Sequence, residues 1–145
     1  MFKHLLVPVD GSDLSKKSLK KVASLAKADN ALVTLIYVSD PMPPLLYADS
    51  TMGYMISQKE HKDACQVFAD GVFQKAATQF GTIKVKTLHI ANVNLAEGIL
   101  DGAKKSKADV IVMASHKLTG IKSFLLGSET HEVIVHSKLP VLVLG

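Results

Sequence analysis

Two small residues, Gly127 and Ser128, follow an apolar run and a polar loop, an order of residue types that can bind an anion. The apolar run, Val110 to Ala114, is typical of a strand that is buried on both faces of a parallel sheet. The residues after Ser128 have a helical pattern, and the first backbone N–H groups of a helix lack partners within it. The spacing therefore predicts a phosphate cradle at a helix N-terminus. The alternative is a plain helix start at which Ser128 is the N-cap.

The loop that follows the apolar run, Ser115 to Thr119, carries polar and basic side chains. Lys122 could supply a cation to a phosphate, and Lys117 could reach one from outside the cradle. Ser115 and His116 resemble a nucleophile and its base, but neighbouring residues on an extended segment point to opposite sides. The sequence also lacks a Gly-x-Ser-x-Gly elbow, a Gly-x4-Gly-Lys-[Ser/Thr] loop and a Gly-x-Gly-x-x-Gly turn. We therefore predict no catalytic residue.

A second candidate ligand group, Asp10, stands at the end of the expected first strand, His4 to Val9. Asp10, Gly11 and Ser12 have the chemistry of a turn, and Ser12 is a suitable N-cap for the next helix. Asp10 could simply be another helix-start residue. However, the carboxyl ends of parallel strands are where open α/β sheets bind ligands, so we favour a ligand-facing carboxylate.

The elements that would position these residues alternate along the chain. Strands are expected at 4–9, 31–38, 85–90, 110–114 and 140–144, and helices at 13–28, 57–80, 92–106 and 129–137. This alternation predicts one open, doubly wound parallel α/β sheet with a Rossmann-like arrangement, formed by residues 1–145 as a single domain. In the longest helix the residues expected to be buried are Ala64, Val67, Phe68, Val72 and Ala76. Gly71 in its interior predicts close packing or a kink, and the apolar connection 39–56 is expected to cover a crevice or a partner.

Composition excludes several classes of protein. The 145 residues are 48% hydrophobic and 21% charged with a formal charge of +4, which is typical of an ordinary globular chain. The lysine clusters at 16–21 and 104–107 are interpreted as solvated helix faces, because no aromatic platform for nucleic acid accompanies them. Cys65 is the sole cysteine, so no internal disulfide can form, and its neighbour His61 gives too few ligands for a metal site. Without a signal peptide or an apolar run of about 20 residues, we expect a cytoplasmic protein that avoids membranes.

Three segments resemble the universal stress protein family: His-Leu-Leu-Val-Pro-Val-Asp-Gly-Ser at 4–12, Leu-Leu-Gly-Ser at 125–128 and His-Ser-Lys-Leu-Pro-Val-Leu-Val at 136–143. The resemblance implies the strand order 3-2-1-4-5, similar to the adenine nucleotide alpha hydrolases, with a crevice between Asp10 and Ala114. It also implies bound ATP, with or without Mg²⁺, and at most slow hydrolysis. The family's motif Gly-x2-Gly-x9-Gly-[Ser/Thr] falls here on Ala114, Lys117, Gly127 and Ser128, so its first two glycines are replaced.

Two functions follow from this resemblance. The first is an adenine-nucleotide sensor that regulates a stress response. The second is a dimeric interaction module that needs no nucleotide, since the glycine motif is incomplete. The residues that the first function places at the nucleotide are Pro8, Val9, Asp10, Ser12, Val38, Met113, Ala114, Ser115, His116, Lys117, Gly120, Lys122, Gly127, Ser128, Glu129 and Thr130.

The last strand predicts a homodimer. An apolar edge strand without a partner promotes aggregation, and pairing two copies across a two-fold axis would remove that hazard. The resembled family commonly dimerises in this way. The expected interface residues are Val141, Leu142, Val143 and Leu144.

Overall fold

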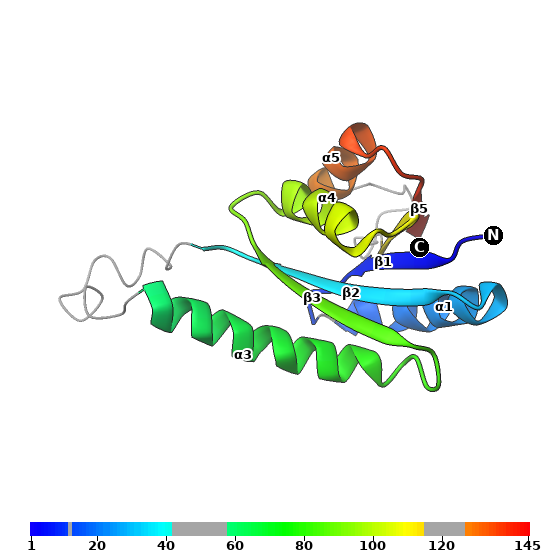
Figure 1. Ribbon diagram of the computed structural model, residues 1–145, viewed down its shortest axis with the longest axis horizontal. Helices are drawn as coiled ribbons and strands as arrows, with labels where there is room; N and C mark the ends of the chain where they lie inside the picture. Colours follow the sequence, from blue (N-terminus) through cyan, green and yellow to red (C-terminus); the bar gives the residue numbers. More distant parts are fainter. Residues whose placement is uncertain (12, 42–57, 115–126) are drawn as a thin grey trace, which may run out of the picture.

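The computed structural model describes residues 1–11, 13–41, 58–114 and 127–145. Its strands form a single parallel sheet in the order β3-β2-β1-β4-β5, which confirms the predicted fold class and strand order (Figure 1). The strands are β1 (His4–Pro8), β2 (Leu32–Ser39), β3 (Val85–Ala91), β4 (Val110–Ala114) and β5 (Val141–Leu144). The sequence placed the strand ends within about two residues, as is usual for predicted boundaries.

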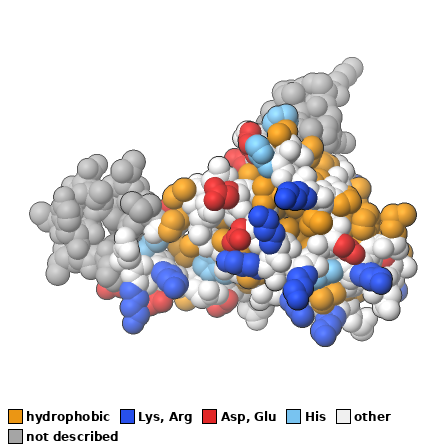
Figure 2. All heavy atoms as spheres, turned by 45° about the horizontal axis from the view of Figure 1, so that its top comes forward, with side chains coloured by type: hydrophobic (Ala, Val, Ile, Leu, Met, Phe, Trp, Pro, Cys, Tyr) orange, Lys and Arg blue, Asp and Glu red, His pale blue; other side chains and the backbone are white. Residues whose placement is uncertain are grey.

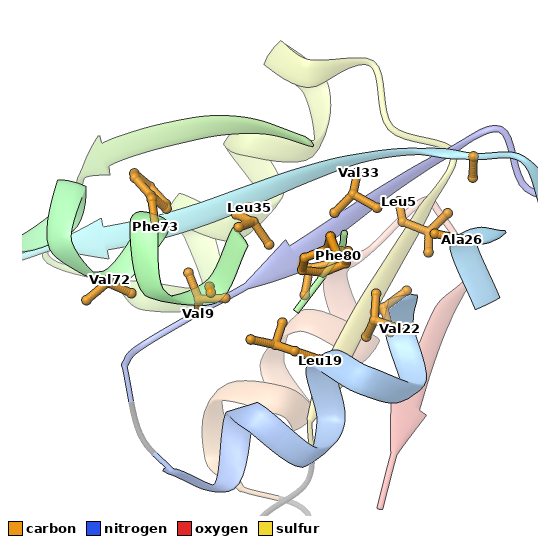
Figure 3. Close-up of a cluster of buried hydrophobic side chains, with 14 of the residues drawn as sticks. Leu5, Val9, Leu19, Val22, Ala26, Val33, Leu35, Val72, Phe73 and Phe80 are labelled. Atoms are coloured by element: carbon orange, nitrogen blue, oxygen red, sulfur yellow. The ribbon is translucent and has the colours of Figure 1, made fainter. Parts of the chain in front are cut away.

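Helices cover both faces of the sheet. Figure 1 shows α1 (Asp13–Asp29) and α3 (Gln58–Ala77) on one face, and α4 (Leu95–Ser106) and α5 (Ser128–His136) on the other. Successive strand residues point to opposite faces, so β1 sends Leu5 into one hydrophobic cluster and Leu6 into the other. The cluster beneath α1 and α3 is drawn in Figure 3, where Leu19 and Val22 of α1 face Phe80 and the strands.

Local backbone chemistry sets the helix ends. After α1, Asn30 adopts a left-handed conformation (φ 52°), and the Ala31 N–H donates to the Ala26 carbonyl at 2.8 Å. Helix α4 begins at Leu95 because the Asn94 side chain caps it, accepting from the Glu97 N–H at 2.9 Å. The predicted start at Asn92 was therefore early by about one turn.

The face that α3 buries differs from the predicted one. The structure buries Val72 and Ala76 as expected, together with Ala69 and Phe73. It leaves Ala64 exposed, Val67 73% exposed and Phe68 56% exposed, so the expectation that these three residues are buried was wrong. Helix α3 packs against β2 and β3, and the side of the helix that meets these strands is the side that carries Ala69 and Phe73. Close packing at Gly71 was also wrong, because a Cβ built there meets nothing within 4 Å.

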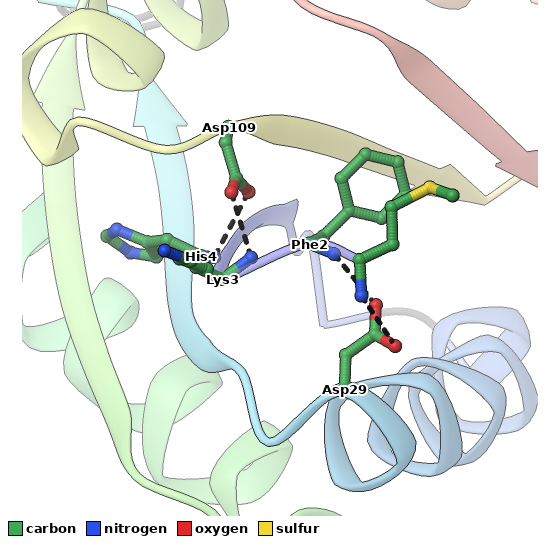
Figure 4. Close-up of polar contacts among 6 residues, drawn as sticks. Phe2, Lys3, His4, Asp29 and Asp109 are labelled. Carbon is green, nitrogen blue, oxygen red and sulfur yellow. Dashed lines mark hydrogen bonds and ion pairs between the residues drawn. The ribbon is translucent and has the colours of Figure 1, made fainter.

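Two aspartates hold the amino end of the chain against the sheet (Figure 4). The Asp109 carboxylate accepts the Lys3 N–H at 2.8 Å and the His4 N–H at 3.0 Å. The Asp29 carboxylate accepts the Phe2 N–H at 2.9 Å, and this hydrogen bond lowers the pKa of Asp29. Asp109 immediately precedes β4, so it ties the start of β1 to the start of its neighbour in the sheet.

Among the helices in the described part of the chain, none is both long enough and apolar enough to cross a membrane.

Candidate functional site

A cavity of about 320 Å³ opens at the carboxyl edge of the sheet, where β1 and β4 end. The chain leaves β1 for β2 on one side, whereas β4 pairs with β1 on the other side. This is the switch point of a doubly wound sheet, where side chains from two strand ends and from helix N-termini converge. The residues that line the cavity are Pro8, Val9, Asp10, Leu95, Ile99, Met113, Ala114, Gly127, Glu129 and Thr130.

The strands supply two walls of this cavity. From β1 and the turn after it come Pro8, Val9 and the exposed Asp10, and from β4 come Met113 and Ala114. The N–H of Val9 donates to the Ile36 carbonyl at 2.9 Å, which keeps the end of β1 against β2. The sequence placed all five residues at the candidate site, and the structure brings them together in one cavity.

The N-terminus of α5 forms the third wall. Gly127 is the N-cap residue (φ −63°, ψ 156°), and it has no side chain to accept a hydrogen bond from the first turn. Ser128 is the first helical residue, and its hydroxyl donates to the Glu129 carboxylate at 3.1 Å. The alternative in which Ser128 caps the helix was therefore wrong. A helix N-terminus without a side-chain cap presents backbone N–H groups and the positive end of its dipole to the cavity.

The predicted cradle also contains an acid. Glu129 and the buried Thr130, both in the first turn of α5, line the same cavity as Gly127. A carboxylate in the first turn stabilises the helix dipole, but it also places negative charge where a phosphate would approach. Ser128 lies between Gly127 and Glu129 in the chain, but it does not line the cavity.

Two apolar residues of the cavity, Leu95 and Ile99, were not predicted as site residues. They lie one turn apart at the start of α4, and the sequence indicated only that they face inward. Ile99 is buried, whereas Leu95 keeps 41% of its surface exposed because it stands at the cavity rim. Their place in the chain could have identified them as site residues. They lie at the start of a helix that follows a parallel strand, and such a helix begins at the same edge of the sheet as the ligand crevice.

Several predicted site residues fall elsewhere. Val38 does not line the cavity, and its methyl groups face Gly98 of α4. The remaining predicted residues, Ser12, Ser115, His116, Lys117, Gly120 and Lys122, lie outside the described residues.

A separate cavity of about 460 Å³ lies between the end of β2, the start of α3 and His89 of β3. His61 and Cys65 line it, and the thiol sulfur is 3.6 Å from the imidazole Nε2. That Nε2 also lies 2.8 Å from the Asp40 carbonyl oxygen. Across the described residues, no group of three or more His, Cys, Asp or Glu side chains could hold a metal ion.

The fold has parallel strands, helices on both faces of the sheet and a cavity at the switch point. These features are typical of the class of doubly wound α/β proteins, in which small ligands bind at the carboxyl edge of the sheet. The chain belongs to the universal stress protein family, whose model matches residues 1–145. It is 33% identical over 143 residues to universal stress protein MJ0531 of Methanocaldococcus jannaschii, covering 99% of this chain and 82% of that one.

Solved structures share this fold. The structure of the M. jannaschii protein MJ0577 is similar with a TM-score of 0.76 and 28% identity, covering 99% of this chain and 96% of that one. A universal stress protein from Archaeoglobus fulgidus, solved in complex with dAMP, has the same fold with a TM-score of 0.67 and 17% identity, covering 99% of this chain and 98% of that one.

Proposed function

We propose that this protein binds an adenine nucleotide in the cavity between β1 and β4 and acts as a nucleotide-responsive regulator in a stress response. The observation that carries the proposal is the meeting of the uncapped α5 N-terminus with Asp10 and an apolar wall in one cavity. At about 320 Å³, its volume lies in the range of small-molecule sites.

Each part of a nucleotide has a chemical counterpart in this cavity. Phosphate oxygens can accept hydrogen bonds from the backbone N–H groups of the first turn of α5, which have no partners within the helix. Leu95, Ile99 and Met113 offer apolar surface to the base, and the Asp10 carboxylate can accept hydrogen bonds from ribose hydroxyls. The dAMP complex of the A. fulgidus protein supports the proposal, because its fold is the same.

The same residues fit ATP accompanied by Mg²⁺. Magnesium prefers oxygen ligands and commonly takes one or two carboxylates together with substrate phosphates and water. Asp10 and Glu129, which belong to different walls of the cavity, are carboxylates of this kind. Bound Mg²⁺ would neutralise phosphate charge that Glu129 would otherwise repel.

Calorimetric titration with ATP, with and without Mg²⁺, tests the proposal. Gly127→Val is the informative variant, because among the described residues a Cβ there meets only the Glu129 carboxylate, at 3.8 Å. The fold should therefore persist while the side chain fills the cradle, and we expect affinity to fall at least about tenfold, or about 1.4 kcal/mol. Gly71→Ala, distant from the cavity, is the control.

Absence of binding heat at roughly millimolar nucleotide would overturn the proposal. The nucleotide-independent interaction module would then remain. Equal affinity of the Gly127→Val protein would show that nucleotide binds away from the α5 N-terminus.

We also infer that two copies of the chain pair through β5. This strand lies at one edge of the sheet with β4 on its inner side, and Val141, Leu142, Val143 and Leu144 all remain partly exposed. Exposed apolar side chains on the neighbouring helix, Ile134 and Val135 of α5, extend the surface that a second copy could cover. Pairing two such edges would give both chains a continuous sheet without an open edge on this side.

A further inference from the structure

The middle of α3 presents an apolar stripe to solvent. Val67 is 73% exposed, and Phe68 is 56% exposed although its ring lies against that of Tyr37 of β2, with 5.6 Å between the ring centroids. Two large apolar residues exposed at consecutive positions of a helix are unusual. Ala64 and Gly71, one turn to either side, are exposed as well, and a Cβ built at Gly71 meets no described residue within 4 Å. Figure 1 shows that α3 lies beneath β2 and β3, on the opposite face of the sheet from α4 and α5.

The stripe has charged ends of opposite sign. Glu60 in the first turn and Lys75 in the last turn are both exposed. At 100° per residue, both fall on the same side of the helix as Val67 and Phe68. Each charge complements the helix dipole at its own end. Lys75 forms no ion pair with any residue that the structure describes.

The residues along this stripe are complementary to those of a second, antiparallel copy of the same helix. A two-fold axis placed between Val67 and Phe68 puts each of them opposite the other residue in a second copy. The same axis puts Ala64 opposite Gly71 of the partner subunit, where two small residues allow the helices to approach closely. It also puts Glu60 opposite Lys75 of the partner subunit.

We propose that the α3 stripe, Glu60, Ala64, Val67, Phe68, Gly71 and Lys75, is a self-association surface at which two copies pair through antiparallel α3 helices. Two-fold symmetry makes each favourable contact occur twice, including the pair of opposite charges. The antiparallel arrangement also places the positive end of each helix dipole next to the negative end of its partner. An isologous contact fits this stripe better than an unrelated partner, because size and charge complement one another within the stripe itself.

This surface is independent of the β5 edge. Helix α3 packs against β2 and β3, and β5 lies at the other edge of the sheet. A chain that used both surfaces would assemble into particles with at least twice the mass of those formed through either surface alone. One helix pair buries little area, so we expect a weak association, seen at a protein concentration on the order of 100 µM.

Sedimentation velocity on the full chain tests the proposal. Val67→Lys should lower the weight-average mass to that of the particle formed without the α3 contact, which is the monomer or, if the chain also pairs through β5, the β5 dimer. Glu60→Lys and Lys75→Glu should each weaken association about tenfold, because each creates two like-charge contacts across the axis. The double variant Glu60→Lys, Lys75→Glu should restore wild-type association, because it exchanges the charges and keeps their pairing.

Lys62→Glu is the matched control, since it changes the same charge on the same helix outside the stripe and should leave the mass unaltered. A mass that Val67→Lys does not change would overturn the proposal. So would a double variant that associates no better than the weaker single variant. If Val67→Lys lowers the melting temperature without changing the mass, another part of the same chain covers the stripe, and self-pairing is excluded.

Discussion

The Glu129 carboxylate has two opposing effects at the residue scale. It lies in the first turn of α5 and lines the proposed nucleotide cavity, where it accepts the Ser128 hydroxyl. Its charge stabilises the helix dipole but repels the phosphates that the same dipole attracts. Which effect dominates depends on whether a cation accompanies the phosphates.

Glu129→Gln should therefore tighten the binding of metal-free ATP by about 1 kcal/mol, roughly fivefold, because the repulsion disappears while the side-chain size is kept. With Mg²⁺ present the gain should shrink or reverse, because the metal loses a carboxylate ligand. Calorimetry in EDTA and in excess Mg²⁺ measures both cases. Glu132→Gln, one turn further along α5 and paired with His136, is the control. No change in either buffer would place the phosphates away from Glu129.

His89 makes the stability of the fold depend on pH. Its Nδ1 lies 2.9 Å from the Gln66 side-chain oxygen, which can only accept, so Nδ1 carries the proton. Its Nε2 then accepts from the Ser39 hydroxyl at 2.7 Å, and the neutral ring has both nitrogens paired. Partial burial lowers the pKa of His89 below its usual 6.5; among its neighbours, Lys62 adds to this lowering and Asp70 opposes it.

Because the folded state prefers neutral His89, the unfolded chain takes up a proton first as the pH falls. The contribution of His89 is complete above pH 6.5 and is lost as the pH falls from 6.5 through the lower folded-state pKa. The loss should be small, roughly a few tenths of a kcal/mol, since the ring is only half-buried. Urea unfolding at about pH 7.5 and about pH 5.5 measures it, and His89→Gln should flatten the difference. An equally steep pH dependence in that variant would assign the effect to another group, such as His4, whose pKa burial also lowers.

At the scale of elements, Gly71 of α3 and Gly98 of α4 have opposite roles. A Cβ at Gly98 would lie 2.7 Å and 3.0 Å from the methyl groups of Val38, and a valine side chain has little freedom to move. Gly98→Ala should therefore cost about 1–2 kcal/mol, despite the better helix propensity of alanine. Gly71→Ala, in open space, should gain about 0.5–1 kcal/mol. Urea unfolding of both variants gives the comparison, and a stabilised Gly98→Ala protein would mean that α4 and β2 can separate without cost.

Much of the fold could be predicted from local patterns. The buried strand Val110–Ala114 and the caps that end α1 depend on residues close together in the sequence, so one sequence suffices to find them. The buried face of α3 could not be found in this way. The apolar stripe through Val67 and the one through Phe73 both have helical spacing, and only the position of the sheet decides between them.

The residues of the candidate site could be predicted where a local sequence pattern marks them, but not where they depend on how distant elements pack. Asp10 could be found because a turn-forming residue directly follows a strand pattern. Gly127 could be found because a small residue directly precedes a helical pattern. The contribution of Leu95 and Ile99 depends on how α4 lies over the ends of β1 and β4, which no local pattern specifies. Ser128 shows the reverse case: a good capping residue type stands one position beyond the N-cap, so its hydroxyl bonds to Glu129 instead.

At the scale of the whole molecule, the proposed β5 pairing predicts a change in mass. Lysines at Val141 and Val143 would place two charges per chain in the paired edge, and both copies would carry them. The variant Val141→Lys, Val143→Lys should therefore halve the particle mass measured by light scattering at micromolar concentration. Val93→Lys, at a position that is 72% exposed and distant from β5, is the control. A wild-type mass of 15.6 kDa would contradict the dimer.

The Asp109 contacts at the start of β1 have a consequence for how the protein is made. The Lys3 N–H and its acceptor are 106 positions apart, so the central strand of the sheet has β2 on one side long before β4 exists. While the chain is being synthesised from its amino end, the edge of β1 that later pairs with β4 has no hydrogen-bonding partner. An unpaired strand edge of this kind can pair wrongly with other chains. The proposed nucleotide cavity needs both strand ends, and a growing chain cannot form it. Nucleotide would therefore be recognised only after the chain has been made and folded through α5, and binding would report that this part of the fold has formed.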